Sequence, residues 1–505
     1  MAYLDSLKAE AKGNARKRGE KPVQEASEGR TLVEQYGGVK IWKLAGDPVR
    51  FYDTPAPHYR GEEKKLITSL IDIAVNVMPP VYKGLSQDEK EKRYLKEILE
   101  IIKATPEIKI PVNSEEFFAR AVVREMAGYG IIDELTKDEW LEEIMVNGPN
   151  KPVFVYHRKY GMMKTSVVFY DDNDIRDLID RIARNIGRRI DTQVPILDAR
   201  LNDGTRVNAT IPPISLDGST LTLRKFRKDP LSAIDLLNYG TMNPRLAAFM
   251  WLCVDGLGVK PANILVAGGT ASGKTSTLNV LSSFIPRQER IVSIEDTAEL
   301  SLPLDHWIRF EVRPPSLEGT GEVDLNELVK NSLRMRPDRI LVGEIRGAEG
   351  YTMFAAMNTG HSGCMGTVHA NSARETLVRL ESPPINVPRI MLSALNFIIL
   401  QNRIHDRKRG LLRRITEFAE VVPTEEGEIS LQVLYEWDPV TDETKATGRQ
   451  CHYLQELKRY TGWTDEQIES EINERKEILE SLQKKGVRKL EDVCAAIQAH
   501  APERK

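Results

Sequence analysis

A glycine-rich segment near the middle of the chain most constrains what this sequence can fold into. It fits the pattern G-x-x-x-x-G-K-[ST] at every fixed position and reads Gly268-Gly269-Thr270-Ala271-Ser272-Gly273-Lys274-Thr275. Residues 264–267 before it are apolar and predict a short buried strand, while residues 276–284 after it predict a helix. A strand, a glycine-rich loop and a helix N-terminus direct several backbone N–H groups at one anion. The segment therefore predicts a phosphate-binding loop.

Each position of this loop has an expected role. We expect Lys274 to place its charge on the outer phosphates of a nucleoside triphosphate. The Thr275 hydroxyl is expected to hold the magnesium ion that accompanies those phosphates. The other expected nucleotide-binding residues are Gly268, Gly269, Thr270, Ala271, Ser272, Gly273 and Ser276.

Charge and cysteine content exclude several other classes of protein. The net charge of -3 is nearly balanced and lacks the strongly basic signature of a nucleic-acid-binding protein. The four cysteines are far apart in the sequence, and no two of them form a C-x-x-C pair. This spacing argues against a zinc site and against a disulfide framework. Such cysteine usage is typical of a reducing cytoplasm.

No segment predicts a membrane span. The N-terminus is charged and lacks the apolar core of a signal peptide. Residues 390–400 are the longest apolar stretch near the C-terminus, but they fall short of the ~20 residues that cross a bilayer. We expect them to form a buried helix, and we expect the protein to dock on a membrane component rather than cross the membrane.

The 505 residues suggest roughly three domains. We expect a mobile charged tail over residues 1–30, a small and mostly helical domain over 31–112, and an α+β domain over 113–226. A hinge linker over 227–235 is expected to precede an α/β domain with a helical C-terminal part over 236–505. In that last domain, strands alternate with helices, which is typical of a parallel sheet covered on both faces.

Local signals place several elements within these regions. Residues 48–59 predict an irregular or edge segment, and Ser86 with Glu89 predicts a capping box for a helix that ends before Pro106. Strands are expected at 153–156 and 221–223, with a hairpin turn at 202–205. Thr464 and Gln467 predict the cap of a C-terminal helix whose apolar face serves the core or a partner.

Carboxylates follow two of the predicted strands. Residues 339–344 predict a strand with a wholly apolar middle, 340–342, that ends in Glu344. Gly343 leaves room for close approach, so we expect Glu344 to orient the water that attacks a bound triphosphate. Residues 291–294 form a second strand that ends in Glu295 and Asp296. We favour Glu295 for hydrogen bonding to metal-bound water, with Asp296 capping the next turn.

Two histidines lie on a third strand-like segment. His361 and His369 are eight residues apart without cysteine partners, which makes them poor zinc ligands. A structural role is as probable as a functional one for His361, whereas the site is favoured for His369.

Along the chain, the phosphate loop is followed by the acidic block at Glu295 and Asp296, the strand end at Glu344 and the block with the two histidines. These four blocks, in this order, resemble the secretion ATPase superfamily that drives type II secretion, type IV pili and type IV secretion. In that family they are the Walker A motif, the Asp box, the Walker B motif and the His box. Segments 138–148, 197–209 and 222–226 look like the family's N-terminal domain, so that residues 115–415 are covered. The sequence from 363 to 376 and the C-terminal helices look most like the archaeal branch, which includes the motor ATPase of the archaellum.

The resemblance implies a RecA-like ATPase core in a homohexameric ring, with ATP and Mg²⁺ as ligands. It implies a polytopic membrane platform protein as partner, accessory cytoplasmic motor proteins as further partners, and a cytoplasmic location at the inner face of the membrane. It also implies arginines of the N-terminal domain that reach the phosphates, and Arg206 and Arg224 occupy matching positions. Arg334, Arg336 and Arg339 flank the Walker B strand and are alternatives that would serve a neighbouring subunit.

The expected function is therefore ATP-driven assembly or rotation of a type IV pilus-like filament, with Glu344, Glu295, Arg206, Arg224 and His369 as catalytic candidates. A nucleic-acid translocating motor or DNA-transfer ATPase is the alternative, because RecA-like rings also pull on DNA or RNA. A third possibility is a structural ring in which nucleotide only holds the subunits together.

Overall fold

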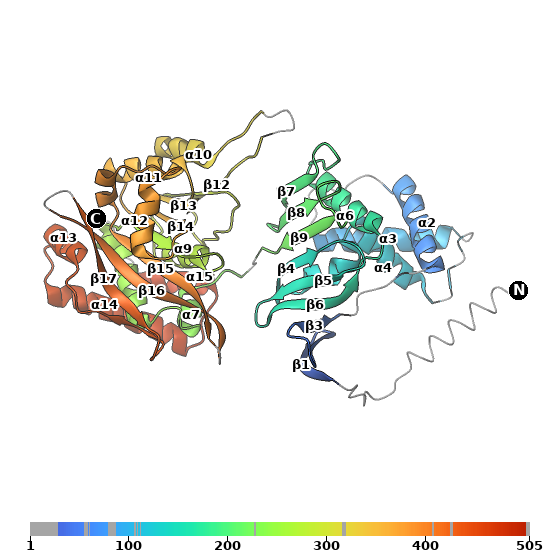
Figure 1. The fold of residues 1–505 in the computed structure, drawn as a ribbon, viewed down its shortest axis with the longest axis horizontal. Coiled ribbons are helices and arrows are strands. Elements are labelled where there is room, and N and C mark those ends of the chain that lie inside the picture. Colours follow the sequence, from blue (N-terminus) through green and yellow to red (C-terminus); the bar gives the residue numbers. More distant parts are fainter. Residues whose placement is uncertain are drawn as a thin grey trace, which may run out of the picture. The chain divides into compact units, whose positions relative to one another are not determined.

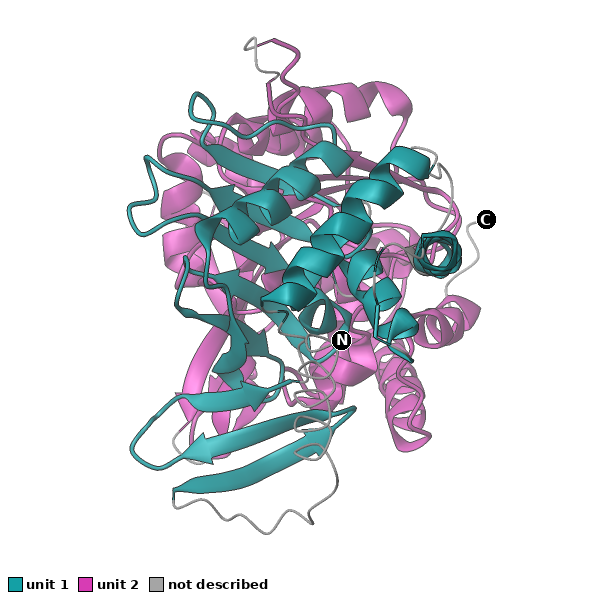
Figure 2. Cartoon of the chain, turned by 90° about the vertical axis from the view of Figure 1, so that its right-hand side faces the viewer, with its two compact units in different colours: residues 1–226 teal, residues 227–505 magenta. Residues whose placement is uncertain are grey.

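The computed structural model describes residues 29–54, 59, 61–78, 87–105, 108, 110–111, 113–201, 203–226, 229–315, 320–406, 409–424 and 428–500. The chain divides into two compact units, residues 1–226 and residues 227–505, which Figure 2 shows in different colours. The expected tail over residues 1–30 lies almost wholly outside the described residues. The same holds for the predicted capping serine, Ser86.

The first unit is built on one nine-stranded sheet with the strand order β1-β2-β3-β6-β5-β4-β9-β8-β7 (Figure 1). Its strands are β1 (Arg30–Tyr36), β2 (Val39–Leu44), β3 (Arg50–Asp53), β4 (Leu141–Val146), β5 (Pro152–His157), β6 (Gly161–Val168), β7 (Ile196–Arg200), β8 (Arg206–Thr210) and β9 (Thr220–Arg224). All neighbours pair antiparallel except β3 and β6. The predicted strands at 153–156 and 221–223 are confirmed by β5 and β9. The hairpin predicted around residues 202–205, of which 202 lies outside the described residues, is confirmed by the pairing of β7 with β8.

Helices of the first unit are α2 (Glu62–Val77), α3 (Gln87–Ala104), α4 (Glu115–Met126), α5 (Asp133–Lys137) and α6 (Asp172–Asn185), with a short 3-10 turn η1 (Gly130–Ile132). The apolar face of α6, which includes Ile175, Leu178 and Ile182, joins the core of the sheet. A second small core lies among α2, α3 and α4, where Leu70, Ile98 and Val122 are buried. The predicted end of α3 before Pro106 is confirmed.

The prediction for residues 48–59 was wrong in one respect. Arg50–Asp53 form β3, an interior strand between β2 and β6. Because β3 pairs with β6, the sheet runs from residue 30 to residue 224 and crosses the expected boundary at residue 112. Both sides of that boundary thus belong to one compact unit, while the hinge over 227–235 stays a prediction.

The second unit contains another nine-stranded sheet, with the order β12-β11-β13-β14-β10-β15-β16-β17-β18. Its strands are β10 (Ile264–Ala267), β11 (Ile291–Glu295), β12 (Trp307–Glu311), β13 (Arg339–Ile345), β14 (Met365–Val368), β15 (Phe397–Asp406), β16 (Gly410–Pro423), β17 (Ile429–Asp438) and β18 (Glu443–Ala446). The strands from β12 to β15 are parallel, as expected, and β16 to β18 extend the sheet antiparallel.

Helices cover both faces of the parallel part (Figure 1). They are α7 (Ala233–Asn238), α8 (Pro244–Asp255), α9 (Lys274–Ser282), α10 (Leu325–Ser332), α11 (Ala348–Asn358), α12 (Ala373–Glu381), α13 (His452–Thr461), α14 (Asp465–Lys484) and α15 (Leu490–His500), with 3-10 turns η2 (Gly256–Gly258), η3 (Leu333–Met335) and η4 (Arg389–Ala394). Alternate residues of β10 face opposite sides, so that Ile264 packs with α8 and α9 while Leu265 packs with α10 and α11. This alternation is what a strand covered on both faces requires.

The capping box predicted at Thr464 and Gln467 is confirmed at the start of α14. The apolar face of α14, with Ile468, Ile472 and Leu479, is buried in the main core, so it serves the core. In contrast, the helix predicted over residues 390–400 was wrong. Ile390 lies in η4 and is largely exposed, and residues 397–400 are the buried start of β15.

All four cysteines are buried and reduced. None of the helices in the described ranges is long and apolar enough to cross a membrane.

Candidate nucleotide-binding site

The phosphate loop follows the central strand β10 and leads directly into α9. All four residues of β10 are buried, and the strand pairs in parallel with β14 on one side and β15 on the other. Helix α9 begins at Lys274, two residues earlier than predicted. Gly273 caps it with φ at 99°, a left-handed conformation that glycine adopts without steric cost. The loop thus lies at the carboxyl edge of the parallel sheet, where ligands of such folds bind.

The side chains of the loop fit an anionic phosphate group. Lys274 is buried, and its Nζ donates to the carbonyl oxygen of Gly269 at 3.0 Å. Burial lowers the pKa of Lys274, because the charged ammonium loses solvation. The Oγ atom of Ser272 is buried without a hydrogen-bond partner in the described part of the chain. A buried cation and an unsatisfied hydroxyl at a helix N-terminus are groups that a phosphate oxygen would satisfy.

Glu344 lies near the end of β13, beside an arginine and a histidine. Arg346 donates to it through Nη2, and Nε2 of His369 lies 3.9 Å from its Oε1. Arg346 also pairs with Asp296 through Nη1 at 3.0 Å. Glu344 and Arg346 both influence the pKa of Lys274 electrostatically. Glu344, the loop lysine and His369 therefore lie near one another at one edge of the sheet, while their catalytic roles stay predictions.

His369 follows β14 directly and remains partly exposed. Burial lowers its pKa, and the nearby charge of Lys274 acts in the same direction. A neutral imidazole is therefore favoured at neutral pH, in which one ring nitrogen accepts and the other donates a hydrogen bond.

Glu295 is the buried carboxylate at the end of β11. Its Oε1 accepts hydrogen bonds from the backbone N–H groups of Glu299 at 2.9 Å and Leu300 at 3.0 Å, so Glu295 itself caps the following turn. Its Oε2 is buried without a hydrogen-bond partner among the described residues. Burial raises the pKa of Glu295 to about 7. Asp296, to which the capping role was assigned, instead pairs with Arg346.

The structure gives a specific reason for the glycine before Glu344. A Cβ atom added at Gly343 would lie 2.9 Å from Cγ of Glu295 and 3.3 Å from its Cβ. The absence of a side chain at this position therefore lets the two acidic strand ends pack closely together.

Two of the remaining candidates, Arg339 and His361, have polar side-chain atoms that are buried. Arg339 is fully buried and forms an ion pair with Glu289, which is also fully buried. It was an alternative for reaching a neighbouring subunit, and its burial excludes that role. His361 lies before β14, where its Nδ1 is buried without a hydrogen-bond partner within the described ranges.

Arg206 and Arg224 belong to the first unit, where they are cross-strand partners on β8 and β9. Arg200 on β7 pairs in register with Arg206, so three arginines form one row across three neighbouring strands. Glu143 on β4 lies next in register, with its Oε1 3.9 Å from Nε of Arg224. Arg200 was not predicted as a site residue, although the alternation of residues in the β7–β8 hairpin places it in the same row as Arg206.

Sequence reasoning also missed two residues beside the phosphate loop. Gln401 on β15 accepts a hydrogen bond from Thr277 of α9, and Arg413 on β16 donates through Nε to the carbonyl oxygen of Ala271 at 3.1 Å. Neither lies in a recognisable motif, and both are more than 100 residues from the loop.

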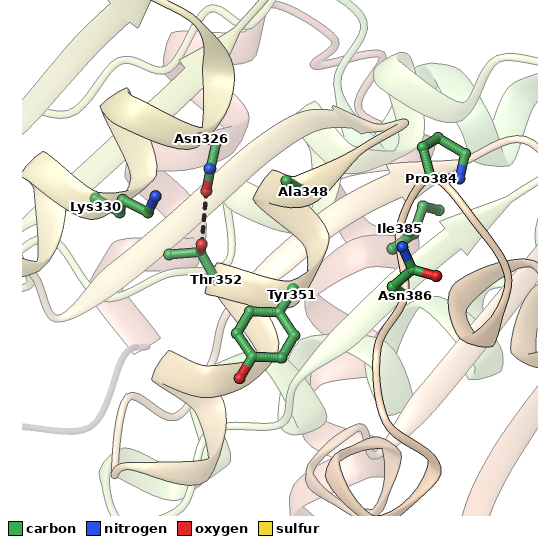
Figure 3. Close-up of a pocket in the computed structure, with 8 residues that line it drawn as sticks. All are labelled: Asn326, Lys330, Ala348, Tyr351, Thr352, Pro384, Ile385 and Asn386. Carbon is green, nitrogen blue, oxygen red and sulfur yellow. Dashed lines mark hydrogen bonds between the residues drawn. The ribbon is translucent and has the colours of Figure 1, made fainter.

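A separate cleft of about 310 Å³ lies elsewhere on the second unit, between α10, α11 and the segment that follows α12. Figure 3 shows Lys330, Tyr351 and Asn386 among the residues that line it, and the hydrogen bond between Thr352 and Asn326. No residue of the phosphate loop lines it, so it is distinct from the nucleotide site.

A parallel sheet with a phosphate loop after its central strand and a carboxylate at the neighbouring strand edge defines a P-loop nucleotide-binding protein. Residues 125–498 match the family described as Type II/IV secretion system protein. The chain belongs to this family, the secretion ATPase superfamily, and its α/β fold with an α+β N-terminal region is the fold of that family.

The chain is also similar to individual proteins. The chain is 34% identical to an uncharacterised protein of Methanocaldococcus jannaschii over 74% of its own length and 75% of the relative. It is 30% identical to the conjugal transfer protein TrbB of Rhizobium radiobacter over 48% of this chain and 72% of that protein. Among solved structures, the VirB11 ATPase of the Brucella suis type IV secretion system is 26% identical, with 56% of this chain and 90% of that chain covered and a TM-score of 0.28.

Proposed function

We propose that this chain is a magnesium-dependent ATPase that forms a homohexameric ring and powers the assembly or rotation of a type IV pilus-like filament. Family membership supports a role in a secretion-type machine. The observation that carries the enzymatic part is the meeting of Lys274, Glu344 and His369 at the carboxyl edge of the sheet.

In this proposal the chain's own residues divide the work of hydrolysis. The loop backbone and Lys274 bind the phosphates, and Glu344 accepts a hydrogen bond from the attacking water and orients it. Arg346 holds the Glu344 carboxylate from one side, which limits the directions in which it can accept a proton. Thr275 and Glu295 are the residues that would hold a magnesium ion, Glu295 through a water molecule. A bound magnesium ion would neutralise charge on the phosphate oxygens.

Arg206 and Arg224 supply positive charge from the first unit when the units close around the nucleotide. An arginine delivered in this way stabilises the transition state only in the closed arrangement, so hydrolysis is coupled to movement. The row of arginines on β7, β8 and β9 supports this assignment, because it concentrates guanidinium groups on neighbouring strands.

The proposed partner is a polytopic membrane platform protein, with accessory motor proteins beside it, and the proposed location is the cytoplasmic face of the membrane. The near-neutral charge of -3 favours a protein partner over nucleic acid. The conjugal transfer relative favours a second candidate, a DNA-transfer ATPase. Stimulation of the ATPase by DNA would support the second candidate, whereas stimulation by lipid and platform protein would support the first.

The test is magnesium-dependent ATP hydrolysis and ring sizing of the full chain and three variants. We expect Lys274→Ala to lose nucleotide binding. Glu344→Gln should bind ATP and form the ring but hydrolyse at least about 100-fold more slowly. Arg206→Ala should bind nucleotide and lose turnover.

If Glu344→Gln hydrolyses ATP like the wild type, the assignment of Glu344 fails and Glu295 becomes the leading candidate. If the ring requires ATP to assemble, but the Glu344→Gln variant still supports filament assembly or rotation, then nucleotide serves only to hold the subunits together.

A further inference from the structure

The β15–β16 hairpin lies against the phosphate loop, and no motif of the sequence accounts for it. A Cβ atom at Gly268 would overlap the backbone oxygen of Gln401, so β15 packs directly on the start of the loop. A Cβ atom at Gly273 would lie 2.8 Å from Nε2 of Gln401 and 3.4 Å from Cδ of Arg413. The hairpin therefore contacts both ends of the loop.

Arg413 contacts the loop at its most strained described position. Ala271 has φ at 56°, in the left-handed region that costs a residue with a side chain about 1–2 kcal/mol. Nε of Arg413 donates to the carbonyl oxygen of this residue at 3.1 Å. A donor fixed at that carbonyl favours the orientation of the peptide group that the loop needs to direct its N–H groups at a phosphate.

The backbone at Arg413 is held in place because the side chain of the next residue, Arg414, is anchored on the other face of β16. Arg414 is buried and forms two hydrogen bonds of 2.8 Å with the carboxylate of Asp442. It also donates to the carbonyl oxygen of Tyr239 at 2.9 Å, at the end of α7. A bidentate arginine–carboxylate pair fixes orientation as well as distance.

We propose that Arg413 is a positioning residue that holds the phosphate loop in its binding conformation before nucleotide arrives. The inference rests on the proposed function, because it assigns a role in nucleotide binding at the same loop. Arg413 lowers the cost of ordering the loop, so its contribution is to nucleotide affinity and not to the chemical step.

The test compares nucleotide binding and turnover in the full-length chain. Arg413→Met keeps the apolar stem beside Gly273 and removes the donor. We expect it to bind ADP about 3- to 10-fold more weakly, which is the net value of one hydrogen bond. The kcat at saturating ATP should remain within about twofold of wild type, and the midpoint of thermal unfolding should not change. Arg413→Lys restores a donor and should recover part of the affinity.

Arg403 provides a matched control, because it is the cross-strand partner of Arg413 on β15 and is exposed. Arg403→Met removes one positive charge from the same hairpin and should bind ADP like the wild type. Equal weakening by both substitutions would overturn the inference, since it would show a general effect of charge. Wild-type affinity in Arg413→Met would overturn it as well, and so would a large fall in kcat at saturation.

Lys274→Ala separates this inference from the proposed function. If the wild type binds ADP, Lys274→Ala does not, and Arg413→Met binds normally, only the role of Arg413 fails. If wild type and Lys274→Ala are equally unable to bind ADP, the proposed nucleotide site itself fails.

Discussion

Replacement of Gly363 by alanine is expected to be among the most damaging small substitutions in the second unit. Gly363 precedes β14 with φ at 74°, and a Cβ atom there would overlap the guanidinium group of Arg339. Arg339 and its partner Glu289 are both fully buried. To make room, the guanidinium must move away from the carboxylate, which leaves two poorly compensated charges in the core.

The magnitude follows from two contributions. The left-handed backbone costs an alanine about 1–2 kcal/mol. Separation of a buried ion pair costs about 3–5 kcal/mol, because the remaining charge has neither water nor partner. Gly360 separates the two contributions. It also has a positive φ, at 107°, but a Cβ atom there would have no neighbour within 4 Å. Gly360→Ala should therefore carry only the backbone cost.

Urea unfolding followed by tryptophan fluorescence measures the difference, since Trp251 is buried in the same unit. We expect Gly363→Ala to be less stable than Gly360→Ala by about 3 kcal/mol or more. If the two variants unfold within about 1 kcal/mol of each other, the buried pair tolerates displacement and the reasoning is refuted.

Two further predictions concern the carboxylates of Glu295 and Asp138. The raised pKa of Glu295, about 7, means that the folded state holds a proton that the unfolded state releases above pH 4.5, so stability falls as pH rises from about 5 to 8. Glu295→Gln removes the titrating group, so the unfolding free energy of the variant minus that of the wild type should increase as pH rises across that range. A difference that does not change with pH would contradict a raised pKa of Glu295. In the first unit, the fully buried Tyr52 donates a hydrogen bond to Asp138 at 2.5 Å. Tyr52→Phe should destabilise that unit by about 1–3 kcal/mol, because the carboxylate loses a buried donor. Urea unfolding measures the change. Tyr170→Phe, at an exposed tyrosine, is the control, and an equal effect of both would contradict the prediction.

The elements around the nucleotide site were predictable because each carries a local signal. Strands β10, β11 and β13 each contain a short, mostly apolar run, and a glycine or an acid follows that run. The buried helix predicted at 390–400 failed because this short apolar stretch, interrupted by Ser393 and Asn396, has no periodicity that distinguishes a strand from a helix. The pairing of β3 with β6 joins residues more than 100 positions apart, and no local pattern records such a contact.

The same limit applies to the site. The proximity of Lys274, Glu344 and His369 was predictable because they lie at or after the carboxyl ends of strands of one parallel sheet, which share an edge. The capping role predicted for Asp296 belongs to Glu295, since the sequence does not show which carboxylate faces the backbone of the next turn. Arg346, Gln401 and Arg413 act through contacts that only the folded chain defines.

The burial of all four cysteines has a practical consequence for measuring motion. Cys253, Cys364, Cys451 and Cys494 lie in the core, and burial raises the pKa of each thiol, so few reactive thiolates form in the folded protein. A maleimide dye would therefore react mainly with cysteines introduced at exposed positions, without removal of the native ones. One label on each unit would convert nucleotide-dependent movement into a change of energy transfer in otherwise unaltered protein.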